Sequence, residues 1–407
     1  MRVLFIAPSR LSRGDATIAA DLARGLPRPT YNSGFHVGFV AAAEAVPQLH
    51  DLGMPALPLS GATPAENLTV LDRIVKGFGP DVLVLADAYA VQQSNPWSGL
   101  TVGLLRERYG RPVAGVDRLG WQAAGYTADC YGGAQLHLPP LLDDCDLVIQ
   151  PGPPHPAAPG TAGVAVAALP PGGLRGGGLR DSGQRADTAP DGRPTVFLVN
   201  SAWEYRNRQR SMPVAQLIDA LPAVLHSHLA ALGRPLRVVH VGPRRWRFTA
   251  ADHLDYQHFN RMPYAMFQAR LAAADVFVTT NALSMTLAQA VLGGVPALLL
   301  DNHERLGPDG LPGWLSGVAP QLRSAHPYRV APLGWHDLLE PLLSAGPYGG
   351  CFATAGIFDR TAVLDALGTL LDDEPARDAL RRRQSDYRAE LAGLPAVGDA
   401  LRAVVTG

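Results

Sequence analysis

The stretch ADVFVTTN at residues 274–281 is followed by SMTLAQA at residues 284–290 and by GGVPALLL at residues 293–300. This order predicts a strand, a polar turn, a helix, a glycine break and a second buried strand. The first turn of such a helix lies just beyond the carboxyl end of a parallel strand, with free backbone N–H groups and the positive end of the helix dipole. The stretch therefore predicts a site for an anionic ligand that carries a nucleotide.

Short apolar runs alternate with helix-length segments in the rest of the chain. They lie at residues 3–7, 35–41, 82–86, 113–116 and 147–150, and the alternation restarts with predicted strands at 195–199, 236–241 and 254–259. Helices are predicted at 214–232 and 262–273. Apolar runs without polar alternation are typical of strands buried on both faces of a parallel sheet. The predicted fold class is α/β, with two Rossmann-like doubly wound domains facing each other across a cleft.

A shift in composition marks the boundary between these domains. Residues 151–194 are rich in proline, glycine and alanine, which favours an irregular connection, although residues 163–169 can form one last strand. We predict an N-terminal acceptor domain at 1–160, a linker at 161–194, a nucleotide-donor domain at 195–375 and a C-terminal helical segment at 376–407. A length of 407 residues suits two domains.

Composition excludes several classes of protein. Apolar residues make up 47% and charged residues 17%, which indicates a globular chain. The net charge of −1 provides no field for a polyanion, so we expect no nucleic-acid partner. The three cysteines are widely spaced and predict neither a disulfide framework nor a metal site. No apolar run is long enough for a signal peptide or a membrane helix, so we expect a cytoplasmic protein without a membrane partner.

Three aspartates follow predicted strands of the N-terminal domain. Asp15 begins the helix after the first strand, and Asp87 and Asp117 come directly after two later strands. Asp15 can accept a proton from an acceptor hydroxyl, or it can serve as a helix N-cap. The other two can orient Asp15 or an acceptor, although each alone is also typical of a turn. We take all three as candidate catalytic residues.

The chain resembles a known family at this point. The run SRGD at residues 12–15, followed by a helix rich in alanine and leucine, looks like the first turn of GT-B glycosyltransferases that modify antibiotics and sterols. The run GVP at residues 294–296 resembles the strand entry of their donor domain. The resemblance implies that a nucleotide sugar is the co-substrate, that no cofactor is needed, that Asp15 is the acceptor-activating base, and that the donor diphosphate lies over a helix start.

The chain departs from the family pattern at the diphosphate site. The position of the family's diphosphate-binding histidine is held by Asn281, and its glycines are replaced by Leu283 and Met285, while Thr286 is retained. Retaining members of the fold carry two glutamates eight residues apart, where this chain has Asn281 and Gln289. Neither amide can act as a carboxylate, so we predict an inverting single displacement.

Further donor contacts are predicted at the ends of other C-domain strands. Arg206 can neutralise a diphosphate, although an exposed arginine cluster without a ligand is an equally good interpretation. The complete set of predicted nucleotide and donor contacts is Ser201, Arg206, Gly242, Arg261, Asn281, Ser284, Thr286 and Gln289. A polar cluster after the buried strand that ends at Leu300 predicts contacts to the donor sugar by Asp301, Asn302 and His303; a turn with an Asx cap explains only the first two.

These features predict a glycosyltransferase of specialised metabolism that acts on a nucleotide-sugar donor and a small-molecule acceptor. Two alternatives stay open: a nucleotide-sugar epimerase of the same architecture, and a non-catalytic GT-B-like binding protein. The sequence does not identify the sugar, the acceptor or the oligomeric state.

Overall fold

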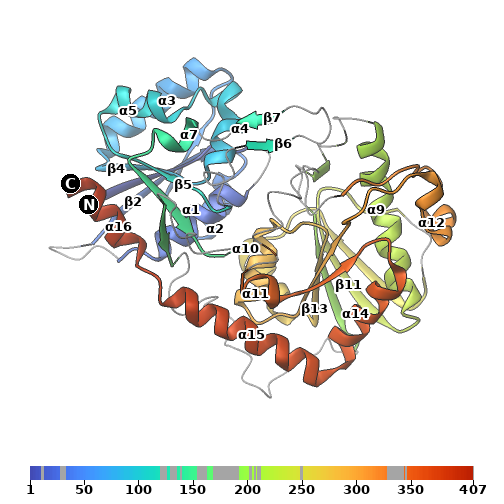
Figure 1. The fold of residues 1–407 in the computed structure, drawn as a ribbon. Helices are drawn as coiled ribbons and strands as arrows, with labels where there is room; N and C mark the ends of the chain where they lie inside the picture. The colour runs from blue at the N-terminus through green and yellow to red at the C-terminus, as the bar shows by residue number, and fades with distance from the viewer. Residues whose placement is uncertain are drawn as a thin grey trace. The chain divides into compact units, whose positions relative to one another are not determined.

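The computed structural model describes residues 1–10, 13–27, 34–119, 126–128, 135–137, 140–153, 163–167, 192–200, 204–205, 208, 212–247, 251–327, 343 and 346–406. It divides into two compact units. Unit 1 comprises Met1–Tyr126, Leu136–Gly173 and Ala389–Gly407, and unit 2 comprises Thr127–Gln135 and Leu174–Arg388. In each unit helices lie on both faces of a parallel sheet (Figure 1).

Unit 1 is built on a seven-stranded sheet with the order β3-β2-β1-β4-β5-β8-β9. All of its strand pairs are parallel. Its strands are β1 (Arg2–Ala7), β2 (His36–Ala42), β3 (Ala56–Leu59), β4 (Val82–Leu85), β5 (Val113–Val116), β8 (Leu147–Pro151) and β9 (Val164–Val166). Its helices are α1 (Gly14–Arg24), α2 (Val46–Asp51), α3 (Pro64–Phe78), α4 (Ala88–Ser98), α5 (Val102–Tyr109), α7 (Pro140–Asp143) and α16 (Val397–Thr406).

Alternate residues of these strands face different helices. Leu4 and Ile6 of β1 pack in one buried cluster with residues of α3, α4 and α5. Phe5 lies between them in sequence and stacks on Phe39 of β2, with ring centroids 5.3 Å apart. This period of two places apolar side chains on both faces, as expected for the interior of a parallel sheet.

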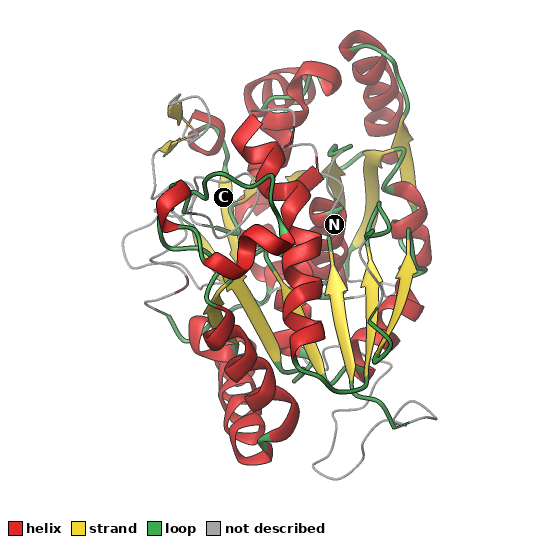
Figure 2. Cartoon of the chain, turned by 90° about the vertical axis from the view of Figure 1, so that its right-hand side faces the viewer, coloured by secondary structure: helices red, strands yellow, loops and turns green. Residues whose placement is uncertain are grey.

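Unit 2 is built on a six-stranded sheet with the order β12-β11-β10-β13-β14-β15. All of its strand pairs are parallel too, and Figure 2 shows the strands in yellow between red helices. Its strands are β10 (Thr195–Val199), β11 (Leu236–Val241), β12 (Leu254–Phe259), β13 (Val276–Thr279), β14 (Ala297–Asp301) and β15 (Ala353–Gly356). Its helices include α9 (Met212–Ala231), α10 (Tyr264–Ala273), α11 (Met285–Leu292), α12 (Gly313–Val318) and α14 (Arg360–Asp372). Unit 2 also contains two 3-10 helices, η2 (Pro308–Gly310) and η3 (Gly349–Cys351), and most of α15 (Glu374–Ala392). The short strands β6 (Tyr126–Ala128) and β7 (Gln135–His137) form a separate two-stranded sheet.

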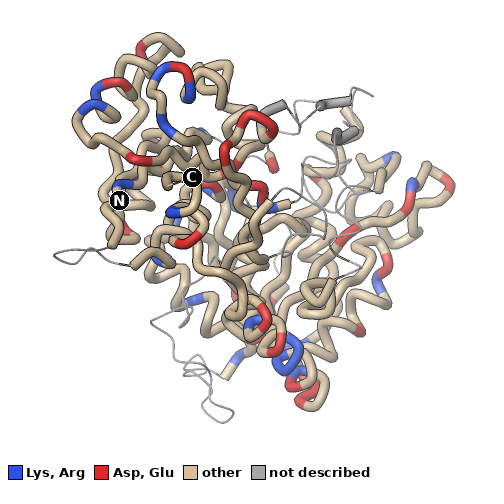
Figure 3. The backbone as a smooth tube through the Cα atoms, turned by 60° about the vertical axis from the view of Figure 1, so that its left-hand side comes forward, with Lys and Arg blue, Asp and Glu red and all other residues tan. Residues whose placement is uncertain are grey.

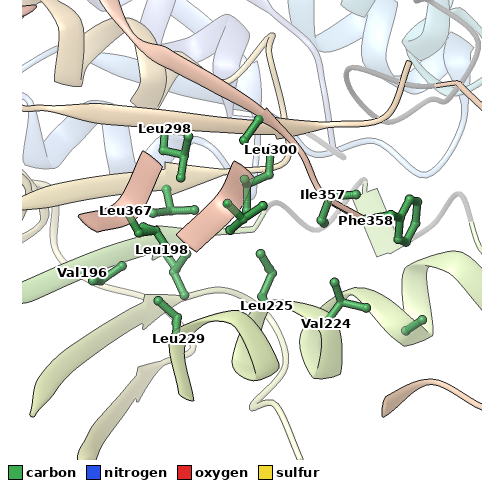
Figure 4. Close-up of a cluster of buried hydrophobic side chains, with 14 of the residues drawn as sticks. Val196, Leu198, Val224, Leu225, Leu229, Leu298, Leu300, Ile357, Phe358 and Leu367 are labelled. Atoms are coloured by element: carbon green, nitrogen blue, oxygen red, sulfur yellow. The ribbon is translucent and has the colours of Figure 1, made fainter. Parts of the chain in front are cut away.

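The core of unit 2 lies between its sheet and helices α9 and α14. Leu198 and Leu298 of the sheet point toward Leu225 and Leu229 of α9 and Leu367 of α14 (Figure 4). On the opposite face, the rings of Phe197 and Phe267 meet edge to face at 5.3 Å and attach α10. Burial on both faces fixes the strand ends that carry the polar residues described below.

The predicted fold class is confirmed, and the strands differ from the sequence-based ones mainly at the edges. The edge strands β3 and β15 were not predicted, because Pro58 interrupts the short apolar run of β3, and β15 contains Thr354 and ends at Gly356. Most of the predicted linker at 161–194 lies outside the described residues. The segment at 376–407 is divided in the structure: α15 continues from unit 2, whereas α16 packs on β8 and β9 of unit 1 through buried residues such as Val397 and Leu401.

Candidate functional site

The strand order places a topological switch point between β1 and β4 in unit 1. Such a crevice, at the carboxyl ends of two strands whose connections leave in opposite directions, is where open α/β sheets bind ligands. Asp15 lies in the first turn of α1 after β1, and Asp87 is the N-cap residue of α4 after β4. Asp117 follows β5, the neighbour of β4. The structure therefore brings the three predicted aspartates to three adjacent strand ends.

Asp15 is buried, with 1% of its surface exposed. The backbone N–H of Ser9 donates to its Oδ2 at 2.9 Å, and the N–H of Ala16 donates to its Oδ1 at 2.8 Å. The N-cap position of α1 is held by Arg13, so Asp15 is not the N-cap itself. Burial raises the pKa of Asp15 to about 7, and the charge of Asp87 adds to the rise, whereas the two hydrogen bonds oppose it.

Asp87 couples Asp15 to the rest of this group. Its Oδ1 accepts the N–H of Ala90 at 2.8 Å, which caps α4. Burial raises the pKa of Asp87 to about 6; the Ala90 hydrogen bond and Arg118 lower it, and Asp117 raises it. Because the charge of Asp87 raises the pKa of Asp15, protonation of Asp87 favours ionisation of Asp15.

Two charged residues of this region were not predicted. Arg118 is 8% exposed, and its Nε donates to the backbone carbonyl of Pro153 at 3.0 Å. Asp21 of α1 is 5% exposed and pairs with Arg24 at 2.8 Å. Burial raises the pKa of Asp21 to about 6 against the opposing effects of Arg24 and Arg118. The sequence signal for Arg118 was its place directly after Asp117 at a strand end.

In unit 2 the switch point lies between β10 and β13, and α11 begins just after β13. Two N–H groups of this helix start, those of Thr286 and Leu287, are bound by a side chain of the same turn. Ser284 Oγ accepts from Thr286 N at 3.1 Å and from Leu287 N at 3.4 Å, and Asn281 Oδ1 accepts from Leu283 N at 2.9 Å. A phosphate at this helix start has to displace these contacts.

Asn281 also contacts an acidic residue that the sequence analysis did not select. Its Nδ2 donates to Glu204 Oε1 at 3.1 Å, and the two side chains are 5% and 8% exposed. Glu204 follows β10, so the contact joins the two strands that flank the switch point. The predicted donor residues Ser201 and Arg206 lie outside the described residues.

The other predicted residues of α11 are also buried. Thr286 is 8% exposed. Gln289 Oε1 accepts from Gln268 Nε2 at 3.0 Å, and Gln289 Nε2 donates to the hydroxyl of Tyr264 at 3.2 Å. Both partners belong to α10. The amide of Gln289 thus joins α11 to α10.

Gly242 lies where a larger residue would meet an imidazole ring. A Cβ on Gly242 would be 2.8 Å from His240 Nε2. The same Nε2 lies 3.1 Å from Asn200 Oδ1, and His240 Nδ1 lies 2.7 Å from the hydroxyl of Tyr256. Burial lowers the pKa of His240 to about 3, and His258 adds to the lowering. His240 is therefore neutral at physiological pH and donates through Nε2 to the Asn200 carbonyl oxygen.

A small cavity of about 40 Å³ lies between α9 and the switch point of β10 and β13. Polar groups line one part of it, namely Asn200, Glu204 and Thr280. Its aromatic and aliphatic lining comes from Tyr205, Trp246 and residues 217–225 of α9. The indole N–H of Trp246 donates to the hydroxyl of Tyr205 at 3.3 Å. The cavity is too small for a nucleotide.

The predicted sugar contacts lie at the end of β14. Asp301 is fully buried and pairs with His303 Nε2 at 2.9 Å. The amide of Asn302 is used inside its own loop, where Nδ2 donates to the carbonyls of Glu304 and His326 at 2.7 and 2.8 Å. His303 is exposed, and Arg261 is exposed just after β12. Of the three sugar candidates, Asn302 has the clearest structural role.

Acidic and basic residues are interspersed along the chain (Figure 3). Among the described residues, no group of three or more histidine, cysteine or acidic side chains is placed to hold a metal ion. The helices of the described part of the chain include none with the length and apolar character that a bilayer crossing requires.

Comparison with known protein families identifies the chain. The profile of a family of unknown function, DUF6365, matches residues 23–407. The chain belongs to this family. No curated protein matches the sequence.

Solved structures similar to this DUF6365 protein share its fold at low identity. Spinosyn forosaminyltransferase SpnP superposes with a TM-score of 0.56 and 15% identity over 100% of both chains. Glycosyltransferase VinC, solved in complex with dTDP, has a TM-score of 0.52 and 15% identity over 100% of both chains. A putative UDP-N-acetylglucosamine 2-epimerase from Listeria monocytogenes has a TM-score of 0.54 and 12% identity, covering 99% of this chain and 94% of its own. These similarities confirm that the DUF6365 protein has the GT-B fold of antibiotic glycosyltransferases.

Proposed function

We propose that this protein is a glycosyltransferase that moves a sugar from a nucleotide diphosphate to a hydroxyl- or amine-bearing small molecule of specialised metabolism. The observation that carries the proposal is Asp15, a buried carboxyl with a pKa of about 7 beside the switch point of unit 1. A general base is most effective when its pKa lies near the working pH. The structural similarity to natural-product glycosyltransferases supports the same reaction class.

Asp15 has the capacity to accept the proton of an acceptor. Each of its oxygens takes one backbone N–H and keeps a further lone pair. In the proposed step the acceptor oxygen or nitrogen attacks the anomeric carbon and its proton passes to Asp15. The bond from that carbon to the diphosphate breaks, and the nucleoside diphosphate leaves with the electron pair. Asp87 and Asp117 act by setting the charge around Asp15.

We further propose that the displacement is inverting. The two positions at which retaining members of the fold carry glutamates are held here by Asn281 and Gln289, and the Gln289 amide is bonded to two residues of α10. Without a carboxylate at either position, the chain offers no nucleophile there for a covalent intermediate. The start of α11 is the proposed diphosphate site, with Ser284 and Thr286 as its hydroxyl donors.

Turnover and ligand binding test this proposal separately. A panel of dTDP- and UDP-sugars is screened by thermal shift, and the ligands that stabilise the protein are then assayed with a set of small acceptors. We expect Asp15→Asn to lower kcat at least about a hundredfold and to leave the shift unchanged. The matched control is Asp51→Asn, an exposed aspartate at the end of α2. Failure of every nucleotide and nucleotide sugar to bind refutes the proposal; unchanged turnover removes Asp15 from it.

The similarity to a 2-epimerase supports a second candidate, an epimerase of nucleotide sugars. An epimerase needs the donor but no acceptor. Incubation with donor alone, followed by product analysis, separates the two: a new nucleotide-sugar epimer supports the second candidate, and an unchanged donor supports transfer.

A further inference from the structure

The acidic side chain of Glu204 contacts the turn that leads into α11, the helix whose start is the proposed phosphate site. Its Oε1 accepts a hydrogen bond from Asn281, in the turn that leads into α11. The carboxylate is 8% exposed and also lines the cavity at the switch point with Thr280. The positive end of a helix attracts a carboxylate and a phosphate alike. The positive end of α11 therefore stabilises the Glu204 carboxylate and a bound phosphate alike, and the two negative charges repel each other.

We propose that Glu204 is a specificity-determining residue that weakens phosphate binding at the start of α11 in proportion to the charge of the phosphate. This inference rests on the proposed function. A free nucleoside diphosphate ends in a phosphate with a second ionisation near neutral pH, whereas in a nucleotide sugar that phosphate is esterified and carries one charge less. Glu204 thus disfavours the product more than the donor and promotes product release.

The burial of this contact makes the effect large. Repulsion between like charges weakens with distance and with solvent screening, and a partly desolvated carboxylate is screened less than an exposed one. The hydrogen-bond donor at position 281 is a neutral amide. The hydrogen bond from Asn281 holds the carboxylate in place.

Glu204→Gln tests the inference because it removes the charge and keeps the shape. A glutamine Oε1 can accept the same hydrogen bond from Asn281. Isothermal titration is carried out with thymidine, thymidine monophosphate, thymidine diphosphate and dTDP-glucose, at pH about 7.5 and fixed ionic strength. We expect Glu204→Gln to bind the diphosphate at least about tenfold more tightly, with a smaller gain for dTDP-glucose and none for thymidine.

Two further variants make the result decisive. Glu204→Ala removes both the charge and the hydrogen bond. We expect its affinity to rise most for the diphosphate, less for dTDP-glucose and not for thymidine, which would show that the gain does not come from new contacts of the glutamine. Glu374→Gln makes the same chemical change at an exposed position in the first turn of α15 and is expected to change no affinity.

The outcomes separate this inference from the proposed function. Equal diphosphate affinity in wild type and Glu204→Gln overturns the inference and leaves the proposed function standing. An equal gain for thymidine also overturns it, because the effect then comes from the shape of the pocket. If no ligand of this panel and no nucleotide or nucleotide sugar of the thermal-shift screen binds to any of these proteins, both the inference and the proposed function fail.

Discussion

Replacing Asp15 by asparagine should change stability in a way that depends on pH. Asp15 is 1% exposed, and burial raises the pKa of its carboxyl from 3.8 to about 7. The folded protein therefore holds a proton that the unfolded chain releases above pH 3.8. The stabilising contribution is fully present below that pH and is lost as the pH rises through about 7.

The size of the effect follows from the two pKa values. The difference between the two pKa values lowers the free energy of unfolding by about 2 kcal/mol at pH 5, where only the unfolded chain is ionised, and by about 4 kcal/mol at pH 8. Asparagine does not titrate, so the Asp15→Asn variant does not lose unfolding free energy in this way as the pH rises. It has one acceptor oxygen for the N–H groups of Ser9 and Ala16, and the N–H left unbonded costs about 1–3 kcal/mol at every pH. We expect Asp15→Asn to gain stability relative to wild type as the pH rises.

Urea unfolding followed by circular dichroism at pH of about 5, 6, 7 and 8 measures this difference. Asp51→Asn is the control, since Asp51 is exposed and its removal involves no desolvated charge. A gap between Asp15→Asn and wild type that stays constant from about pH 5 to about pH 8 would refute the reasoning. Asp15 would then titrate as an ordinary carboxyl, and its suitability as a base near neutral pH would be lost.

Three further substitutions test the packing and charge of the two units. Arg118→Met should cost about 3–5 kcal/mol at pH 8 and less at pH 5, because it removes the buried cation near Asp87; a cost below about 0.5 kcal/mol in urea unfolding at both pH values contradicts this. Gly242→Ala should destabilise by about 1–3 kcal/mol, since its Cβ would lie 2.8 Å from His240 Nε2; an unchanged melting temperature would show that the ring moves freely. Gly368→Ala, inside α14 with no atom within 4 Å of the added Cβ, should stabilise by about 0.5–1 kcal/mol, and a loss of stability would mean that this helix is packed differently.

Much of the fold could be predicted because buried parallel strands have a simple signature. The apolar runs of β1, β4 and β5 lack polar residues, and the carboxyl ends of neighbouring parallel strands share one edge. The grouping of Asp15, Asp87 and Asp117 follows from that geometry alone. The edge strands β3 and β15 lack the signature: only Ala56 and Leu59 of β3 and Ala355 of β15 are buried, whereas all four residues of β4 and of β5 are buried.

The contacts of the donor site could not be predicted in the same way. Glu204 and Asn281 are separated by 77 positions in the sequence, and no periodicity links them. Asn281 was selected because it replaces a histidine of the related family, yet the acceptor of its hydrogen bond depends on how β10 and β13 pair. Serine commonly caps helix N-termini, but whether the cap formed by Ser284 leaves N–H groups for a ligand depends on the folded loop.

The two switch points differ in the charge that they bury, and the difference bears on function. At its switch point unit 2 buries Glu204 beside the neutral amide of Asn281, and Asp301 is buried at the end of the neighbouring strand β14. The imidazole of His240 is kept uncharged by its surroundings. Unit 1 buries Asp15 and Asp87, which are each destabilising when ionised. An asparagine at position 15 would relieve part of that cost at neutral pH. Carboxyls with such shifted pKa values cluster at active sites, where stability is traded for activity. The destabilising effect that the pH experiment measures is therefore the physical argument for placing the chemistry at Asp15.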